Sequence, residues 1–208
     1  MVAATNLYQF LSDIKDGVTI LGSARLSSSN KYYTVARELG NLLGKNNFTV
    51  ITGGGPGIME AANRGAFEMN GKSMGLNIQL PFEQILNPYV TKSTSFNYFF
   101  TRKVMLTSPA TAFVIFPGGF GTMDELFEIV DLISLGFISK VPIILVGKEF
   151  WEPLLKFLQI SCCEIGSVKK EIIDSWHIVD SAQSAFEYIK DLKGISPSGR
   201  ISPNSFHS

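Results

Sequence analysis

Two segments of this sequence share one plan, in which an apolar run is followed by a cluster of glycines and then by residues at helical spacing. Residues 113–125 read Phe-Val-Ile-Phe-Pro-Gly-Gly-Phe-Gly-Thr-Met-Asp-Glu, and residues 49–63 read Thr-Val-Ile-Thr-Gly-Gly-Gly-Pro-Gly-Ile-Met-Glu-Ala-Ala-Asn. Such strand–turn–helix junctions are typical of parallel sheets, because neighbouring parallel strands must be joined by a crossover connection, usually a helix. The two junctions therefore predict an α/β fold.

The rest of the chain repeats this alternation of strand and helix patterns. Nearly continuous apolar runs such as 141–146 predict strands that are buried on both faces, which requires helices on both sides of the sheet. We therefore expect a Rossmann-like, doubly wound parallel sheet. The strands are expected at 18–24, 48–52, 73–80, 113–116, 141–146 and 177–179, with a further short strand at 89–91, and the helices at about 30–45, 58–70, 97–109 and 123–135, from about 150, and ending at 192.

A single domain is expected, since no break in composition divides the 208 residues and this length suffices for one α/β core. Residues 1–193 are assigned to that domain. Residues 194–208 are rich in Ser, Pro and Gly and carry no apolar period, so they are expected to form a flexible tail.

The charge balance limits the classes of partner. Lys and Arg together number 18, as do Asp and Glu, so the chain has no overall positive field to hold a nucleic acid polymer or an anionic membrane surface. The apolar runs are far shorter than the ~20 residues that span a bilayer, and the start of the chain lacks the pattern of an export signal. A small-molecule ligand and a cytoplasmic location are therefore expected.

The residues that commonly ligate metals are poorly placed for that task. Cys162 and Cys163 are adjacent, His177 stands at an expected strand start, and His207 lies in the polar tail. Neither pair has the spacing of a zinc or redox site, so no metal site is expected.

The two glycine loops are candidate binding sites for phosphate. Ligands of doubly wound sheets bind at the carboxyl ends of the strands, where both loops and Ser23, after the first strand, must lie. Glycine lets backbone N–H groups approach an anion closely, and a helix N-terminus adds unpaired N–H groups and a favourable dipole. The alternative is that each loop is only a tight turn between a strand and a helix.

The glycine spacings disfavour two common nucleotide sites. A dinucleotide fingerprint that begins at Gly53 needs glycine where Ile58 stands, and the strand that follows ends in Gln79-Leu80 without a carboxylate for a ribose. The spacing after Gly118 also departs from the fingerprint. No Gly-Lys-Ser/Thr sequence follows either loop, so a P-loop is excluded.

Four charged side chains are placed to reach the glycine loops. Arg102 and Lys103 lie in the expected helix that leads into the second glycine junction, where a guanidinium can lie over the site, although most such side chains are solvent-exposed. Asp124 and Glu125 stand in the expected first turn of the next helix, where capping alone would account for them. Because adjacent helical residues point about 100° apart, we expect Glu125 to enter the site and Asp124 to lie at its rim.

Three elements of the sequence together resemble the LOG ("Lonely Guy") family. Residues 117–125 match its PGGxGTxxE signature, Arg102-Lys103 matches the Arg-Lys pair upstream of that signature, and residues 53–59 look like its other glycine loop. The resemblance extends over residues 15–192. It implies a nucleotide-binding Rossmann-like fold, commonly dimeric, and phosphoribohydrolase activity on nucleoside 5′-monophosphates such as AMP or cytokinin riboside monophosphates, which releases the free base and ribose 5-phosphate. No cofactor is expected.

Within this resemblance, we expect the second glycine loop to hold the 5′-phosphate through backbone N–H groups and the Thr122 hydroxyl. Glu125 is expected to position water or ribose hydroxyls as positive charge develops at the anomeric carbon, and Arg102 to orient the substrate. The catalytic candidates are therefore Arg102 and Glu125. The substrate-binding candidates are Ser23, Gly54, Gly55, Gly57, Lys103, Gly118, Gly119, Gly121, Thr122 and Asp124.

Two other functions are considered for a chain of this kind. The first is a non-catalytic nucleotide sensor or molybdenum-cofactor carrier, since related Rossmann-like proteins use similar glycine loops; the presence of Arg102 and Glu125 favours hydrolysis instead. The second is a pyridoxal phosphate enzyme, because many relatives carry the label lysine decarboxylase. Lys103 alone does not establish the Schiff-base site that such an enzyme needs.

Self-association is expected as well. The helices expected at 97–109 and 123–137 carry more large apolar side chains on their outer faces than one face of a sheet needs. These side chains are Phe99, Phe100, Leu126, Phe127 and Ile129. We therefore predict a homodimer.

Overall fold

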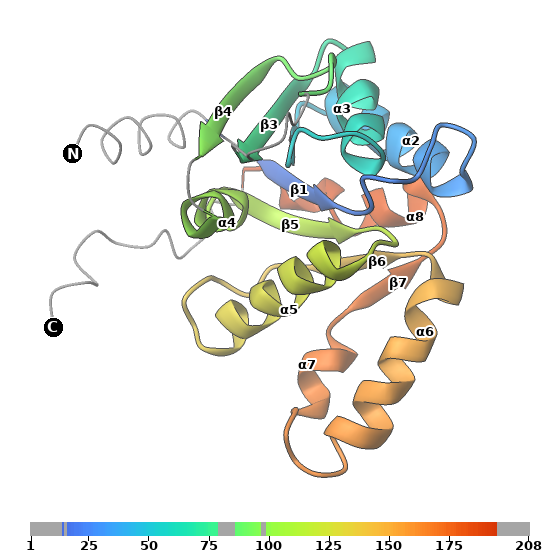
Figure 1. The fold of residues 1–208 in the computed structure, drawn as a ribbon, viewed down its shortest axis with the longest axis vertical. Coiled ribbons are helices and arrows are strands. Elements are labelled where there is room, and N and C mark those ends of the chain that lie inside the picture. The colour runs from blue at the N-terminus through green and yellow to red at the C-terminus, as the bar shows by residue number, and fades with distance from the viewer. Residues whose placement is uncertain (1–13, 15, 79–85, 97–98, 195–208) are drawn as a thin grey trace, which may run out of the picture.

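The computed structural model describes residue 14 and residues 16–78, 86–96 and 99–194. These residues form a parallel sheet of seven strands in the order β4-β3-β2-β1-β5-β6-β7 (Figure 1). The strands are β1 (Gly17–Leu21), β2 (Thr49–Thr52), β3 (Lys72–Ile78), β4 (Lys92–Phe96), β5 (Ala110–Ile115), β6 (Ile143–Val146) and β7 (His177–Val179). The chain winds outward from β1 to β4, returns to the centre, and winds outward again from β5 to β7, which confirms the predicted doubly wound fold.

Helices cover both faces of the sheet (Figure 1). They are α2 (Lys31–Lys45), α3 (Ile58–Glu68), α4 (Phe99–Thr107), α5 (Phe120–Ser134), α6 (Lys148–Phe157), α7 (Lys170–Asp174) and α8 (Ala182–Glu187), with a π-helical turn at Leu158–Cys162 and a 3₁₀ turn at Lys190–Leu192. In the part of the chain described here, no helix is both long and apolar enough to cross a bilayer.

The core is split by the sheet because alternate residues of a strand point to opposite faces. Val18 and Ile20 of β1 pack in the cluster that holds α2, α3 and α8, whereas Leu21 packs in the cluster that holds α5, α6 and α7. Met105 of α4 packs on Met74 and its neighbours on the same face as α5. The helix α4 therefore lies beside α5, which places Arg102 and Lys103 near the second glycine loop.

The helices α2 and α3 touch closely. Asn30 caps α2 by accepting a hydrogen bond from the Tyr32 backbone N–H at 2.9 Å. Gly40 of α2 and Gly65 of α3 have no side chains to separate the two helices, and a Cβ at Gly40 would overlap the carbonyl oxygen of Ala62. These glycines therefore allow the two helix backbones to approach each other.

One expected strand lies elsewhere in the structure, and one helix was not expected. The strand expected at 89–91 lies instead at Lys92–Phe96, because Asn87 forms a turn in which its side chain accepts a hydrogen bond from the Tyr89 N–H at 3.2 Å. The helix α7 was not expected, since five residues are too short to show a helical period.

The prediction of an exposed apolar face on α5 is partly wrong. Leu126 and Ile129 are 0% and 2% exposed and belong to the core, whereas Phe127 is 41% exposed. The expected tail at 195–208 and the side chains of Phe99 and Phe100 lie outside the described residues.

Candidate functional site

The two glycine loops meet at the point where the strand order reverses. The strands β1 and β5 are neighbours from which the chain winds in opposite directions, and ligands of doubly wound sheets bind at the carboxyl ends of such strands. The Ser23 N–H donates to the Pro117 carbonyl at 3.1 Å, and the Ser23 carbonyl accepts from the Ile58 N–H at 3.0 Å. Gly57, with a φ of +72°, lies so close to Ser23 that a Cβ would overlap its carbonyl oxygen. Ser23 therefore connects both loops.

The second glycine loop presents an uncapped helix N-terminus. The helix α5 begins at Phe120, three residues earlier than expected, and its N-cap residue Gly119 makes no side-chain cap. A Cβ at Gly119 or Gly121 would meet no atom within 4 Å, whereas a Cβ at Gly118 would overlap the buried Thr122 hydroxyl. Gly118 is thus needed for packing, but Gly119 and Gly121 leave open space beside the first-turn N–H groups, the arrangement that binds anions.

The earlier start of α5 also corrects the expectation for Asp124 and Glu125. Both residues lie in the second turn of the helix, and no acidic residue stands in the first turn, so helix capping does not explain them. The two side chains diverge as adjacent helical residues must. The Asp124 side chain is 62% exposed and the Glu125 side chain is 17% exposed.

The Arg102 side chain extends from α4 toward both glycine loops. Its Nε donates to the Leu76 carbonyl of β3 at 2.9 Å, and its Nη1 lies 3.4 Å from Glu125 Oε1. Its other terminal nitrogen occupies the space where a Cβ of Gly53 would lie. The Arg102 side chain is 12% exposed, so it is not the solvated stripe that is the common role of such residues.

Burial raises the pKa of the Glu125 carboxyl above the ordinary range of glutamate. The positive charges of Arg102 and Lys103 act in the opposite direction, and the negative charges of Asp124 and Glu128 add to the effect of burial. Glu125 is therefore a partly desolvated acid beside a guanidinium, a combination that is frequent at catalytic sites.

Lys103 is held by the outer side of α5. Its Nζ lies 2.8 Å from Asp124 Oδ2 and 2.6 Å from Glu128 Oε2. Burial acts to lower the pKa of Lys103, but the hydrogen bonds with Asp124 and Glu128 outweigh it, so the pKa is raised. The amine therefore stays protonated at neutral pH and is a fixed charge rather than a nucleophile.

The first glycine loop is supported by buried polar residues that the sequence analysis missed. Thr52, Asn63, Ser73 and Asn87 are at most 5% exposed and are joined by side-chain hydrogen bonds. Gly54, with a φ of +76°, donates its N–H to the Thr52 hydroxyl at 2.9 Å. In the sequence, only the presence of Asn63 on the apolar face of α3 hints at this network.

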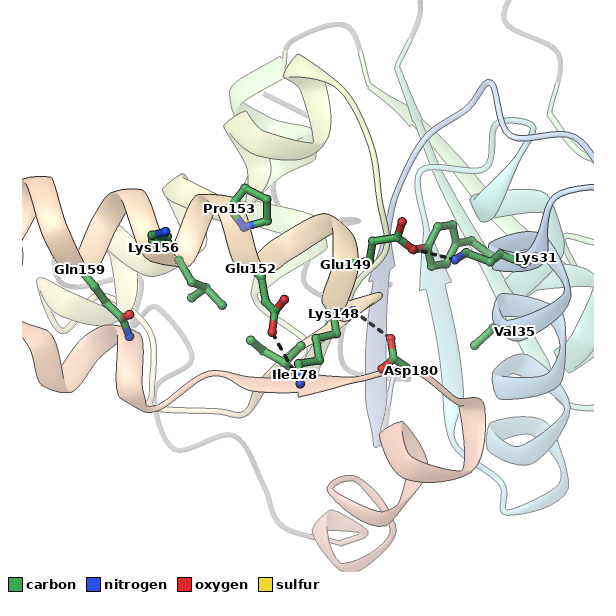
Figure 2. A pocket seen from close by; sticks show the side chains of 12 residues that line it. Lys31, Val35, Lys148, Glu149, Glu152, Pro153, Lys156, Gln159, Ile178 and Asp180 are labelled. Carbon is green, nitrogen blue, oxygen red and sulfur yellow. Dashed lines mark hydrogen bonds and ion pairs between the residues drawn. The ribbon is translucent and has the colours of Figure 1, made fainter.

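A large cavity lies elsewhere on the carboxyl edge. Its volume is about 1320 Å³, and it lies between the start of α2, α6 and β7 (Figure 2). Two ion pairs lie in its lining, in which Lys31 is 3.2 Å from Glu149 and Lys148 is 3.5 Å from Glu152. None of the predicted site residues lines it. Size alone therefore does not identify the site.

No metal-binding group emerges from the described residues, in which no three His, Cys, Asp or Glu side chains gather around a common point. The predicted residues that do come together are Ser23, Gly57, Arg102 and Glu125 with the second glycine loop. Lys103 and Asp124 pair with each other at the outer edge of this group.

Known proteins resemble this chain in sequence and in fold. The family model described as "Possible lysine decarboxylase" matches residues 59–189. The cytokinin riboside 5′-monophosphate phosphoribohydrolase LOG1 of Arabidopsis thaliana is 30% identical over 176 residues, which cover 82% of this chain and 80% of that protein. A cytokinin riboside 5′-monophosphate phosphoribohydrolase of Rhodococcoides fascians is 26% identical over 151 residues, or 71% of this chain and 76% of that protein.

Among solved structures, the molybdenum cofactor binding protein of Rippkaea orientalis superposes with a TM-score of 0.66 at 19% identity, over 86% of this chain and 97% of that chain. At that identity the likeness concerns the fold alone. The family match covers more than half of the chain, and the relative from Arabidopsis aligns over four fifths of both sequences. This chain belongs to the LOG family.

Proposed function

We propose that the protein is a phosphoribohydrolase that cleaves the N-glycosidic bond of nucleoside 5′-monophosphates, AMP or cytokinin riboside monophosphates, to the free base and ribose 5-phosphate. The observation that carries this proposal is the position of Glu125. Its partly buried carboxylate stands about one and a half helical turns inside the uncapped N-terminus of α5 and 3.4 Å from Arg102. The helix end proposed to bind the anion and the acid thus lie about 7.5 Å apart along one helix axis.

The 5′-phosphate would bind at the start of α5. The first-turn N–H groups there carry the positive end of the helix dipole, and the open space at Gly119 and Gly121 lets phosphate oxygens reach them. The Thr122 hydroxyl lies in the same turn. On the other side of the switch point, Ser23, Gly54, Gly55 and Gly57 are proposed to contact the sugar or the phosphate.

At the anomeric carbon, the bond between C1′ and the base nitrogen breaks, and its electron pair stays with the nitrogen, which takes up a proton. The oxygen of water then bonds to C1′ and gives up a proton. The ionised Glu125 carboxylate would stabilise the positive charge that develops on the sugar and orient water or ribose hydroxyls. Arg102 would orient Glu125 and the substrate, while Lys103 and Asp124 set the charge at the rim.

The residues do not fit a pyridoxal phosphate site. A Schiff base forms through a neutral lysine amine, whereas the Lys103 ammonium is held by two carboxylates that raise its pKa. We therefore derive no step through that cofactor. A non-catalytic sensor or molybdenum-cofactor carrier remains the alternative, and it predicts binding without release of a base.

The first prediction concerns turnover. Release of adenine from AMP is expected to fall about 10²–10⁴-fold in Glu125→Ala, because the positive charge that develops on the sugar loses its carboxylate partner. It is expected to fall substantially in Arg102→Ala as well, because Glu125 and the substrate lose the guanidinium that orients them. The matched control is Arg37→Ala, which removes an arginine paired with Glu68 on the outer surface of α2 and α3. Circular dichroism would establish that each variant is folded. Unchanged rates in both site variants would refute these roles.

The second prediction concerns pH. If Glu125 works in its ionised form, kcat/KM falls as the pH drops through the raised pKa of this carboxyl, above the ordinary value of about 4.3. Lys103→Met removes a charge that lowers this pKa, so the acidic limb should move to higher pH. Asp124→Asn removes a charge that raises it, so the limb should move to lower pH. A limb that stays fixed in both variants would contradict the assignment.

The third prediction separates packing from binding in the second glycine loop. Gly121→Ala should leave the free energy of unfolding unchanged or raise it by up to about 1 kcal/mol, since alanine favours helix and its Cβ meets no atom. The same methyl should obstruct the phosphate and raise both the KM for AMP and the inhibition constant of ribose 5-phosphate. Gly118→Ala, which collides with Thr122, should instead destabilise the fold. Normal affinity in Gly121→Ala would exclude phosphate from this loop.

The fourth prediction concerns self-association, which we propose occurs through the outer face of α5 and the residues after it. The exposed side chains there are Phe120 (97%), Phe127 (41%), Leu135 (63%) and Phe137 (62%). Phe127→Glu is expected to lower the mass measured by light scattering, because it places a charge in the apolar contact. Phe157→Glu on α6 is the control at a similarly exposed position. A monomeric mass for the unmodified protein would rule out the dimer.

A further inference from the structure

We infer that Asn87 is a positioning residue for the substrate: it holds the first glycine loop so that the Gly55 N–H is presented to an oxygen of the ribose 5-phosphate moiety. The inference rests on the proposed function and extends it to a residue outside the glycine motifs. Asn87 lies in the connection between β3 and β4, 5% exposed, where the sequence shows only an Asn-Pro turn signal.

Asn87 reaches the loop with both its backbone and its side chain. Its backbone N–H donates to the Gly54 carbonyl at 2.9 Å. Its Nδ2 lies 3.1 Å from the same carbonyl oxygen, 3.0 Å from the Gly55 carbonyl oxygen and 3.0 Å from Asn63 Oδ1. All three neighbours of Nδ2 are acceptors, and Oδ1 accepts from the Tyr89 N–H, so the orientation of the amide is fixed by its partners.

These contacts determine where the loop can donate. In a trans peptide the carbonyl and the following N–H point in opposite directions. Because the Gly54 carbonyl is directed at Asn87, the Gly55 N–H of the same peptide plane points away from Asn87. The Gly55 carbonyl is also bound to Asn87, and the residue after it is Pro56, which has no N–H. Among residues 54–56, the Gly54 N–H is bound to the Thr52 hydroxyl and Pro56 has no N–H. The Gly55 N–H is therefore the one backbone donor of these three residues that points away from Asn87.

The network behind Asn87 makes this orientation rigid. Asn63 Oδ1 accepts from both Asn87 and the Thr52 hydroxyl, the latter at 2.6 Å, and Asn63 Nδ2 donates to Ser73 Oγ at 2.8 Å. The network ties β2, α3, β3 and the connection after β3 to one another. Buried polar groups that are all paired in this way hold a unique geometry, since any rotation leaves a group without a partner.

The amide of Asn87 is chemically required at this position. Two carbonyl oxygens face its Nδ2, so a carboxylate of the same shape would set oxygen against oxygen and add a negative charge near a bound phosphate. Loss of the side chain would instead remove the Asn87 donor from the Gly55 carbonyl and leave the Gly54 carbonyl with only the Asn87 backbone N–H. Either change would also disturb Gly53, which packs against the Arg102 guanidinium.

The test compares Asn87→Ala and Asn87→Asp with the control Thr111→Val. The control removes one buried hydrogen bond, which the Thr111 hydroxyl donates to the Gly17 carbonyl at 2.9 Å, at the amino ends of β5 and β1. Calorimetry with ribose 5-phosphate measures binding without turnover. We expect its Kd to rise about tenfold in Asn87→Ala and further in Asn87→Asp, and to stay within about twofold in Thr111→Val. The KM for AMP should rise in parallel, with a smaller change in kcat.

A role in packing alone predicts the reverse order, because aspartate keeps the volume of asparagine and alanine does not. Tighter binding by Asn87→Asp than by Asn87→Ala, or unchanged binding by both, would overturn the inference. A measurement on the unmodified protein needs no folded variant: the Gly55 amide signal in ¹⁵N spectra should shift when ribose 5-phosphate is added, and a Gly55 signal that does not respond also overturns it.

These outcomes are distinct from a failure of the proposed function. Binding of ribose 5-phosphate without release of adenine from AMP would refute the hydrolase and leave the role of Asn87 standing on the affinities. Hydrolysis of AMP with Asn87 variants that bind normally would refute only the positioning role. An unmodified protein that neither binds ribose 5-phosphate nor releases adenine from AMP would refute both.

Discussion

The candidate site depends on a junction of backbone hydrogen bonds at the carboxyl edge of the sheet. Backbone groups that leave a buried strand need partners, and here Ser23 supplies them to two loops at once, through its N–H to Pro117 and its carbonyl to Ile58. This junction sets the starts of α3 and α5 relative to each other. The N-termini of both helices, with the positive ends of their dipoles, therefore lie near Ser23. It also requires glycine at position 57, because a Cβ would overlap the Ser23 carbonyl oxygen.

In the proposed site, the side-chain charges leave the binding of phosphate dependent on backbone N–H groups. Arg102 and Lys103 face the carboxylates of Asp124, Glu125 and Glu128, so two cations and three acids give one net negative charge when all are ionised. Such a cluster does not by itself attract a dianion. The attraction must come from first-turn N–H groups, which carry roughly half a positive charge at a helix N-terminus. In the proposed site, Gly119 and Gly121 therefore serve affinity rather than folding, because a Cβ at either position would meet no protein atom.

The fold could be read from the sequence because apolar runs and glycine turns alternate along nearly the whole chain. The approach of Arg102 to the site followed from the same order, since its helix leads into β5. The start of α5 was misjudged because a glycine-rich sequence such as residues 118–121 is typical of a loop. In the structure the helix begins at Phe120, and Gly121 lies in its first turn. Because of that error, and because apolar residues occur on both sides of α5, the sequence did not show that Leu126 and Ile129 are buried. Asn87 and Asn63 were missed because their contact spans 24 residues and leaves no local pattern.

The position of Glu125 favours the proposed hydrolase over a carrier on physical grounds. A protein that only binds a phosphate gains nothing from an acid about one and a half turns away, because the carboxylate repels the ligand and its burial costs free energy, as the raised pKa records. The same carboxylate becomes favourable when positive charge develops on the sugar, since it then interacts more strongly with the transition state than with the bound substrate. Arg102 holds the acid in an ion pair at 3.4 Å, and its charge favours the ionised form of the carboxyl. The arrangement is thus unfavourable for binding and favourable for bond cleavage, which is the balance that catalysis requires.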